Sequence, residues 1–83
     1  MNGVRIGKVT HYFDRIHVVV LELERPLALG DHVQFVKRGM VLFEQDITSM
    51  QVSHQGISSA QAGEEVAVRV IEEVPGNTEV YRL

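Results

Sequence analysis

The sequence predicts an all-β domain, a small closed antiparallel barrel, and three observations support this prediction. Apolar residues recur at a spacing of two more often than at three and four, which is typical of strands. Turn-forming residues interrupt these runs at short intervals, as they do in barrels and sandwiches. A glycine followed by an acid occurs twice at the head of an alternating run. No segment has the length and periodicity of a stable helix.

The expected strands are rich in β-branched residues, which fit a pleated surface. The first run alternates Val4 and Ile6, and the second contains Ile16, Val18 and Val20. The later runs are Val33-Gln34-Phe35 and Val66-Ala67-Val68-Arg69-Val70. Glycine, proline, asparagine and aspartate mark the turns between the runs. The expected turns are Phe13-Asp14-Arg15, Arg25-Pro26, Leu29-Gly30-Asp31, Lys37-Arg38-Gly39, His54-Gln55-Gly56, Ala62-Gly63-Glu64 and Pro75-Gly76-Asn77.

The two glycine-acid corners, Gly30-Asp31 and Gly63-Glu64, precede Val33 and Val66, which we expect to point into the core. A glycine takes positive φ at low cost, and the acid after it can accept hydrogen bonds from backbone amides of the turn. Repeated tight corners suit a closed barrel, because closure removes exposed sheet edges. Such turns also precede strands in other β proteins, so the recurrence alone does not require a barrel.

The composition indicates one globular domain over residues 1–83. Cysteine is absent, which excludes disulfides and thiolate metal sites. The N-terminus has no signal-peptide pattern, and the longest apolar run is far shorter than the roughly 20 residues of a spanning helix. We therefore expect a cytoplasmic protein with no membrane association.

The charge pattern disfavours general binding to nucleic acids. Eleven acids and eight bases give a net charge of −3, and the bases are scattered along the chain. Without a basic stripe there is no electrostatic footprint for phosphates, so we expect no non-specific binding to nucleic acid. A specific RNA contact is still compatible with this composition.

Two long segments resemble known proteins over nearly the whole chain, from Ile6 to Leu83. They resemble the short translation elongation factor-like proteins, which are similar to domain 2 of elongation factor Tu, and the C-terminal barrel of collagenase-like peptidases linked to RNA modification. The residues that carry the resemblance are Ile6-Gly7-Lys8-Val9, Leu29-Gly30-Asp31, Phe43-Glu44-Gln45, Ser49-Met50-Gln51, Ala62-Gly63-Glu64 and Val80-Tyr81.

This resemblance implies a closed barrel of about six antiparallel strands with a filled interior. It also implies a non-catalytic binding module, a detached domain 2 that acts in translation through a partner protein or an RNA-containing complex. The alternative is an accessory subunit that positions or stabilises a collagenase-like peptidase or an RNA-modifying enzyme. The sequence contains no G-x-x-x-x-G-K-[ST] motif, so we expect no nucleotide hydrolysis and no cofactor.

The resemblance also suggests one RNA contact. Gln51 falls where that family has a glutamate near the terminal adenine of tRNA. An amide can still donate and accept hydrogen bonds at a base edge, although the charge is lost. An exposed strand residue without a ligand is the alternative for Gln51.

No catalytic or metal site is evident from the sequence. If a hairpin is centred on Asp14, then His11 and His17 are opposed on one face, but His32 and His54 lie in other turns. The serines have no nucleophile elbow around them. Neighbouring acids such as Glu64-Glu65 face opposite sides of a strand. We therefore expect no metal and no enzymatic activity.

The run Val18-Val19-Val20-Leu21 suggests an interaction surface, because two of its four side chains must point away from the core. We assign Val19 and Leu21 to the outward pair, although the pattern fits the opposite facing equally well. An outward apolar pair favours a protein partner or self-association. Alternatively, loops around Met40 to Leu42 cover the pair.

Overall fold

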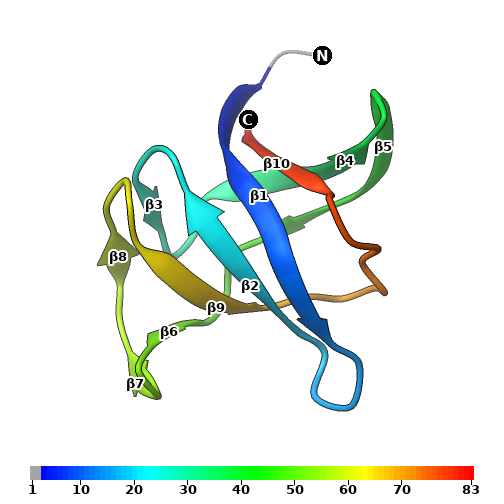
Figure 1. Cartoon of the computed structure of the whole chain (residues 1–83). Helices are drawn as coiled ribbons and strands as arrows, with labels where there is room; N and C mark the ends of the chain where they lie inside the picture. The colour runs from blue at the N-terminus through cyan, green and yellow to red at the C-terminus, as the bar shows by residue number, and fades with distance from the viewer. Residues whose placement is uncertain (1–2) are drawn as a thin grey trace.

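The computed structural model describes residues 3–83, which contain strands and turns but no helix. The prediction of an all-β domain is therefore confirmed. In these residues no helix could cross a membrane. The strands, labelled in Figure 1, are β1 (Val4–Phe13), β2 (Val18–Leu23), β3 (Leu27–Ala28), β4 (His32–Lys37), β5 (Met40–Asp46), β6 (Met50–Val52), β7 (Gln55–Gly56), β8 (Ser59–Ala60), β9 (Glu65–Arg69) and β10 (Glu79–Arg82).

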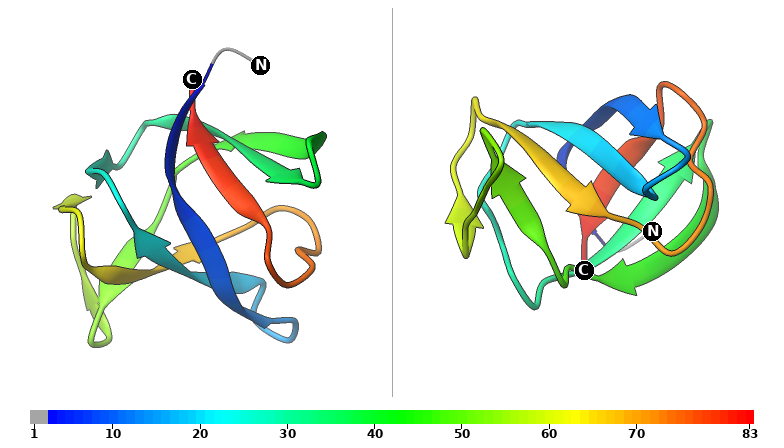
Figure 2. Two further views of the ribbon diagram at one scale, coloured as in Figure 1. Left: turned by 45° about the horizontal axis from the view of Figure 1, so that its top comes forward. Right: turned by 90° about the horizontal axis from the view of Figure 1, so that it is seen from below.

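Eight of the strands form one antiparallel sheet in the order β5-β4-β10-β1-β2-β9-β6-β7, and β3 pairs with β8 in a small second sheet. The large sheet curls around the interior, as Figure 2 shows. Within residues 3–83 its end strands β5 and β7 do not pair with each other, so the backbone ladder stays open. The closed six-stranded barrel is therefore not confirmed, and the structure is a curled sheet with two free ends.

The inner faces of the strands enclose a single apolar core. Phe35 of β4 and Phe43 of β5 are directly paired, and their rings stack with centroids 4.6 Å apart. Val33 and Val66, the valines that follow the two glycine-acid corners, are buried as predicted. The largest fully buried side chains are Phe35, Ile6, Leu21, Leu27, Ile47, Val19, Val33, Val36, Val66, Val68, Val74 and Val80.

The facing of β2 is the reverse of the one assigned from the sequence. Val19 and Leu21 are 0% exposed in the core, whereas Val18 and Val20 lie half-buried on the outer face. The prediction that Val19 and Leu21 point outward is therefore wrong. The physical reason is Glu22, which shares a face with Val18 and Val20 and whose carboxylate must stay in water.

The two corners, Gly30-Asp31 and Gly63-Glu64, have the predicted geometry. Their glycines have φ angles of 89° and 92°. In each corner the carboxylate accepts a hydrogen bond from the backbone amide three residues earlier, at 3.0 Å from Ala28 N and 3.1 Å from Gln61 N. The sequence repeat is therefore also a structural repeat, in which glycine turns the chain and the acid holds the turn.

A buried glutamine joins β5 to the end of β9. Gln45 is 6% exposed, and its Nε2 donates to the backbone oxygen of Arg69 at 2.8 Å. Its Oε1 accepts from the backbone N–H of Ile71 at 2.9 Å. The side-chain amide thus bonds the C=O of Arg69 and the N–H of Ile71, as the backbone of one residue on a neighbouring strand would do. It satisfies these backbone groups at the end of β9, just beyond the last pair of β9 with β6 in residues 3–83.

Replacing Gly63 by valine tests the corner geometry. A β-branched residue at positive φ is strained, so Gly63→Val should lower the free energy of unfolding by more than about 1 kcal/mol. Urea unfolding followed by circular dichroism measures this. Gly76→Ala is the control, because its added Cβ would meet nothing within 4 Å and its φ is outside the left-handed region. Equal stabilities of the two variants would contradict the strain.

Replacing Gln45 by leucine tests the bridge. Gln45→Leu keeps the side chain near its original size but leaves Arg69 O and Ile71 N without their partner, which should cost about 1–3 kcal/mol for each unsatisfied group. Thermal and urea unfolding measure the loss. Gln61→Leu, at an exposed position, should change the free energy by less than about 0.5 kcal/mol. A Gln45→Leu protein as stable as the parent would show that the bridge contributes nothing.

Candidate functional site

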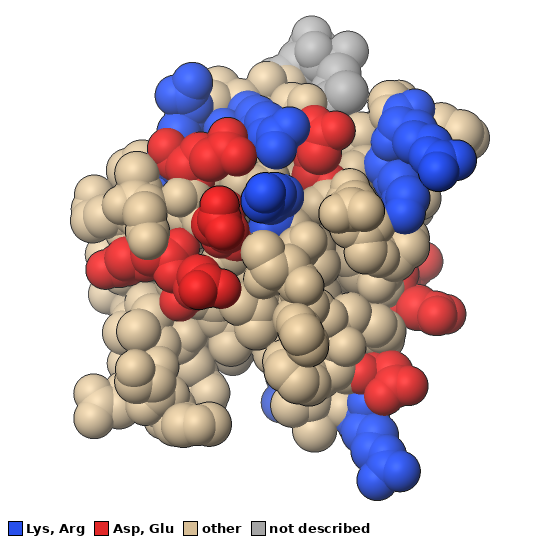
Figure 3. All heavy atoms as spheres, viewed as in Figure 1, with Lys and Arg blue, Asp and Glu red and all other residues tan. Residues whose placement is uncertain are grey.

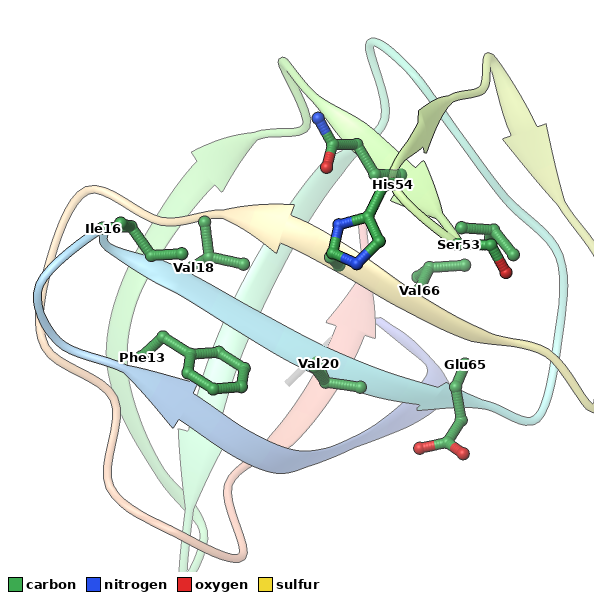
Figure 4. A pocket seen from close by; sticks show the side chains of 11 residues that line it. Phe13, Ile16, Val18, Val20, Ser53, His54, Glu65 and Val66 are labelled. Atoms are coloured by element: carbon green, nitrogen blue, oxygen red, sulfur yellow. The ribbon is translucent and has the colours of Figure 1, made fainter.

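An apolar groove of about 420 Å³ lies on the outer face of β2, β9 and β6. Its floor contains Val18 and Val20 of β2 together with Ala67 of β9, all half-buried. Figure 4 shows the side chains that surround it. The groove therefore lies directly over the outward pair of β2, and the sequence run that suggested an interaction surface does contribute to one.

Two hairpins form the walls of the groove. The β1–β2 hairpin supplies Phe13 and Ile16, which are 44% and 59% exposed. The β6–β7 hairpin supplies Val52 and His54 on the other side. In Figure 3 the hollow is visible in the lower part of the molecule between two projections, of which the right-hand one also carries acidic and basic side chains on its outer side. Because the exposed apolar side chains face a shared concavity, this surface differs from scattered surface hydrophobes.

The turn of the β6–β7 hairpin holds His54 over the groove. Val52 pairs with Gln55, so Ser53 and His54 form a two-residue turn, and their φ angles are 52° and 65°. Two positive φ angles define a type I′ turn, whose twist matches that of the strands. Neither residue is a glycine, so the turn carries backbone strain of the kind that clusters at functional sites.

One end of the groove is acidic. Glu22 of β2 and Glu65 of β9 are directly opposed in the register, and both are exposed. In Figure 4 Glu65 lies at the end opposite Phe13 and Ile16, and in Figure 3 acidic side chains lie above the hollow. Within residues 3–83 no ion pair involves Glu22 or Glu65. The groove is thus apolar along its floor and negative at one end.

Gln51, the candidate RNA contact, is exposed on β6 and lines this groove. It is paired with Ala67 on one side and Gly56 on the other. It also borders a shallower hollow of about 550 Å³ that includes Leu29 and Ile57. The structure thus places Gln51 at the candidate site, and its contact with RNA stays a prediction.

The predicted opposition of His11 and His17 is wrong. His11 pairs with Val20, and His17 lies in the turn with a φ of 54°. The reason is that Phe13 and Val18 form the last pair of the hairpin, so the turn is longer than one centred on Asp14 alone. In the part of the chain that the structure describes, no group of three histidine, aspartate or glutamate side chains is arranged to hold a metal ion.

A second polar cluster, on β4 and β5, was not found from the sequence. His32 Nδ1 lies 2.7 Å from Asp46 Oδ1, and His32 Nε2 lies 2.9 Å from Glu44 Oε1. Hydrogen bonds to Asp46 and then to Glu44 raise the pKa of His32 above its ordinary value of 6.5. The hydrogen bonds that the Glu44 carboxylate accepts from Gln34 and then from His32 lower the pKa of Glu44. Alternation places His32, Gln34, Glu44 and Asp46 on one face, but only the register of the hairpin brings them together.

No family model matches the chain. An uncharacterized protease of Methanocaldococcus jannaschii is 29% identical over 80 residues, which are 96% of this chain but only 20% of that protease. The chain therefore spans about a fifth of the length of the curated relative that it matches.

Solved structures of one peptidase domain share the fold. The C-terminal domain of a U32 peptidase from Geobacillus thermoleovorans superimposes with a TM-score of 0.86 at 16% identity, over 98% of this chain and 92% of that one. The selenomethionine variant of the same domain gives a TM-score of 0.85, also at 16% identity, over 93% and 96%. These similarities support the peptidase part of the resemblance seen in the sequence, and not the elongation-factor part.

The His32 cluster should make stability depend on pH. Because the pKa of His32 is higher in the folded protein, its contribution is fully present below the unfolded pKa of 6.5 and is lost as pH rises through the folded pKa. The depressed pKa of Glu44 acts in the opposite sense, so its contribution is lost only as pH falls through a value below 4.5. The difference in Tm between the parent and His32→Gln should therefore shrink as pH rises from about 6 to 9.

Thermal unfolding at a series of pH values measures this difference. His11→Gln is the control, since His11 forms no ion pair within residues 3–83. A Tm difference for His32→Gln that stays constant over the whole pH range would exclude a charged His32 as its cause.

Proposed function

We propose that this chain is a non-catalytic accessory domain of a U32 peptidase-like protein in the cytoplasm, which positions or stabilises the larger part of that protein. Two findings support the proposal. The sequence relative is a protease of which this chain matches a fifth, and the structural relatives are a C-terminal domain of a U32 peptidase. In both, this chain corresponds to a small part of a larger protein that is named as a protease or peptidase. The proposal applies whether that part lies in the same polypeptide or in another.

The observation that carries the proposal is the apolar groove over Val18 and Val20. Burying an apolar side chain that would otherwise be wet contributes roughly 1.5 to 3 kcal/mol. Phe13 and Ile16 extend this surface on the β1–β2 hairpin. A protein partner that covers the groove gains from all four side chains, and no chemical step has to occur on this chain.

The second candidate is the detached elongation factor domain 2, acting in translation through a ribonucleoprotein. The exposure of Gln51 in the groove is the observation that favours it. The acidic end at Glu22 and Glu65 weighs against it, because phosphates are repelled by unpaired carboxylates. The relatives in both comparisons are also peptidase proteins. The accessory function is therefore the better supported of the two.

Cross-linking in the cell of origin tests the proposal. The tagged chain is compared with Val18→Ser/Val20→Ser, and cross-linked proteins are identified by mass spectrometry. We expect cross-links to a peptidase-family protein that fall at least about tenfold in the double variant, which corresponds to about 1.4 kcal/mol of lost contact.

Ile71→Ser is the matched control, since Ile71 is 67% exposed but lies outside the groove. A thermal midpoint near that of the parent confirms that the double variant is folded. Recovery of ribosomes or tRNA in place of a peptidase-family protein would favour the translation function. Cross-links that persist in the double variant would show that another surface holds the partner.

A further inference from the structure

On the outer face of β2 and β9, three side chains of one strand lie directly opposite three of the other. The register pairs Val18 with Arg69, Val20 with Ala67, and Glu22 with Glu65. These three rows run along the outer face from a row that contains the exposed Arg69, through the apolar row of Val20 and Ala67, to the acidic row. Because paired strands in the middle of the sheet fix the rows, the groove offers a partner a preformed pattern.

The acidic row is unfavourable for this chain by itself. Like charges directly opposite each other on neighbouring strands are destabilising. Lys8 of β1 is opposite Glu22 on its other side, but no ion pair joins them in residues 3–83. Other carboxylates are paired, as Glu79 is with Arg5 at 2.8 Å. The pair Glu22 and Glu65 therefore leaves negative charge at the end of an apolar groove.

We propose that the groove binds a short apolar peptide segment that carries a lysine or arginine beside Glu22 and Glu65. This inference rests on the proposed function and specifies the chemistry of the contact. The apolar side chains of the segment lie over Val18, Val20 and Ala67, and the cation lies between the two carboxylates. The volume of about 420 Å³ is at the lower end of ligand pockets, roughly 300 to 1,000 Å³, so a few side chains fill it.

Charge complementarity excludes some occupants and favours this one. An acidic end repels the phosphates of nucleic acid, and it disfavours an acidic peptide for the same reason. A second copy is the main competitor, because its β4–β5 hairpin carries Arg38 next to the exposed Met40, Val41 and Leu42. That contact would join different surfaces of the two copies, so it would give a ring or an open chain of copies. A segment of another protein, or of another part of a longer chain, avoids this.

Two fluorescein-labelled peptides serve as probes. Both contain two leucines and a phenylalanine, and one has two adjacent lysines where the other has two glutamates. Fluorescence anisotropy with the full chain at low ionic strength should show about tenfold tighter binding of the lysine peptide, with the ratio shrinking as salt is added. Glu22→Gln/Glu65→Gln should bring the two affinities within about twofold, and Val20→Ser should weaken both peptides.

Glu72→Gln/Glu73→Gln is the matched control, because these exposed acids do not line the groove and should leave both affinities unchanged. Equal binding of the two peptides, stronger binding of the glutamate peptide, or no binding of either would overturn the inference. Sedimentation that shows self-association, lost in Met40→Ser/Leu42→Ser, would assign the groove to a second copy instead.

The outcomes separate this inference from the proposed function. If a peptidase-family protein is cross-linked through the groove but the peptides show no charge preference, the accessory function stands and the basic-apolar segment is wrong. If the lysine peptide binds as expected but the cross-linked protein is unrelated to peptidases, the groove chemistry stands and the accessory function is wrong.

Discussion

Strand β2 can bury only one of its two faces, and the groove follows from this constraint. The strand lies between β1 and β9 in the large sheet, with Val19 and Leu21 at 0% exposure on its inner face. Val18 and Val20 must then face outward, because alternate residues of a strand point to opposite sides. Within residues 3–83 these two side chains line the groove and are half-buried. The same strand therefore builds the core and leaves an apolar surface outside it.

The curled sheet holds its shape through side chains as well as strand pairing. Gln45 of β5 supplies a donor to Arg69 O and an acceptor to Ile71 N at the end of β9, beyond the last pair of β9 with β6 in residues 3–83. The acids of the two glycine corners hold their turns in a similar way, since each carboxylate accepts from a backbone amide three residues earlier. These contacts fix the ends of β4, β5 and β9. The start and the end of β9, which carries part of the groove, are thus both held by side-chain hydrogen bonds.

The acidic end of the groove links the fold to its proposed function. Placing Glu22 opposite Glu65 costs stability without a partner, yet the register of β2 and β9 requires it. Relief of that repulsion by a cation adds to the gain from covering Val18 and Val20. The chain is similar in fold to the C-terminal domain of a U32 peptidase, and the proposed partner of this surface is the rest of such a protein.

The sequence alone determined the strand class and the corners, because period-two alternation and glycine-acid turns are local signals that need no distant residue. It also placed an apolar surface in the run from Val18 to Leu21. The sequence indicates which pair faces outward only when Glu22, which must face water, is included in the alternation. Only the tertiary structure decided the rest. Glu65 meets Glu22 and Gln45 reaches Ile71 because strands distant in sequence pair or pack together. His32 meets Asp46 because of the register of the β4–β5 hairpin. Register depends on how all strands share one core, and no short stretch of sequence contains that information.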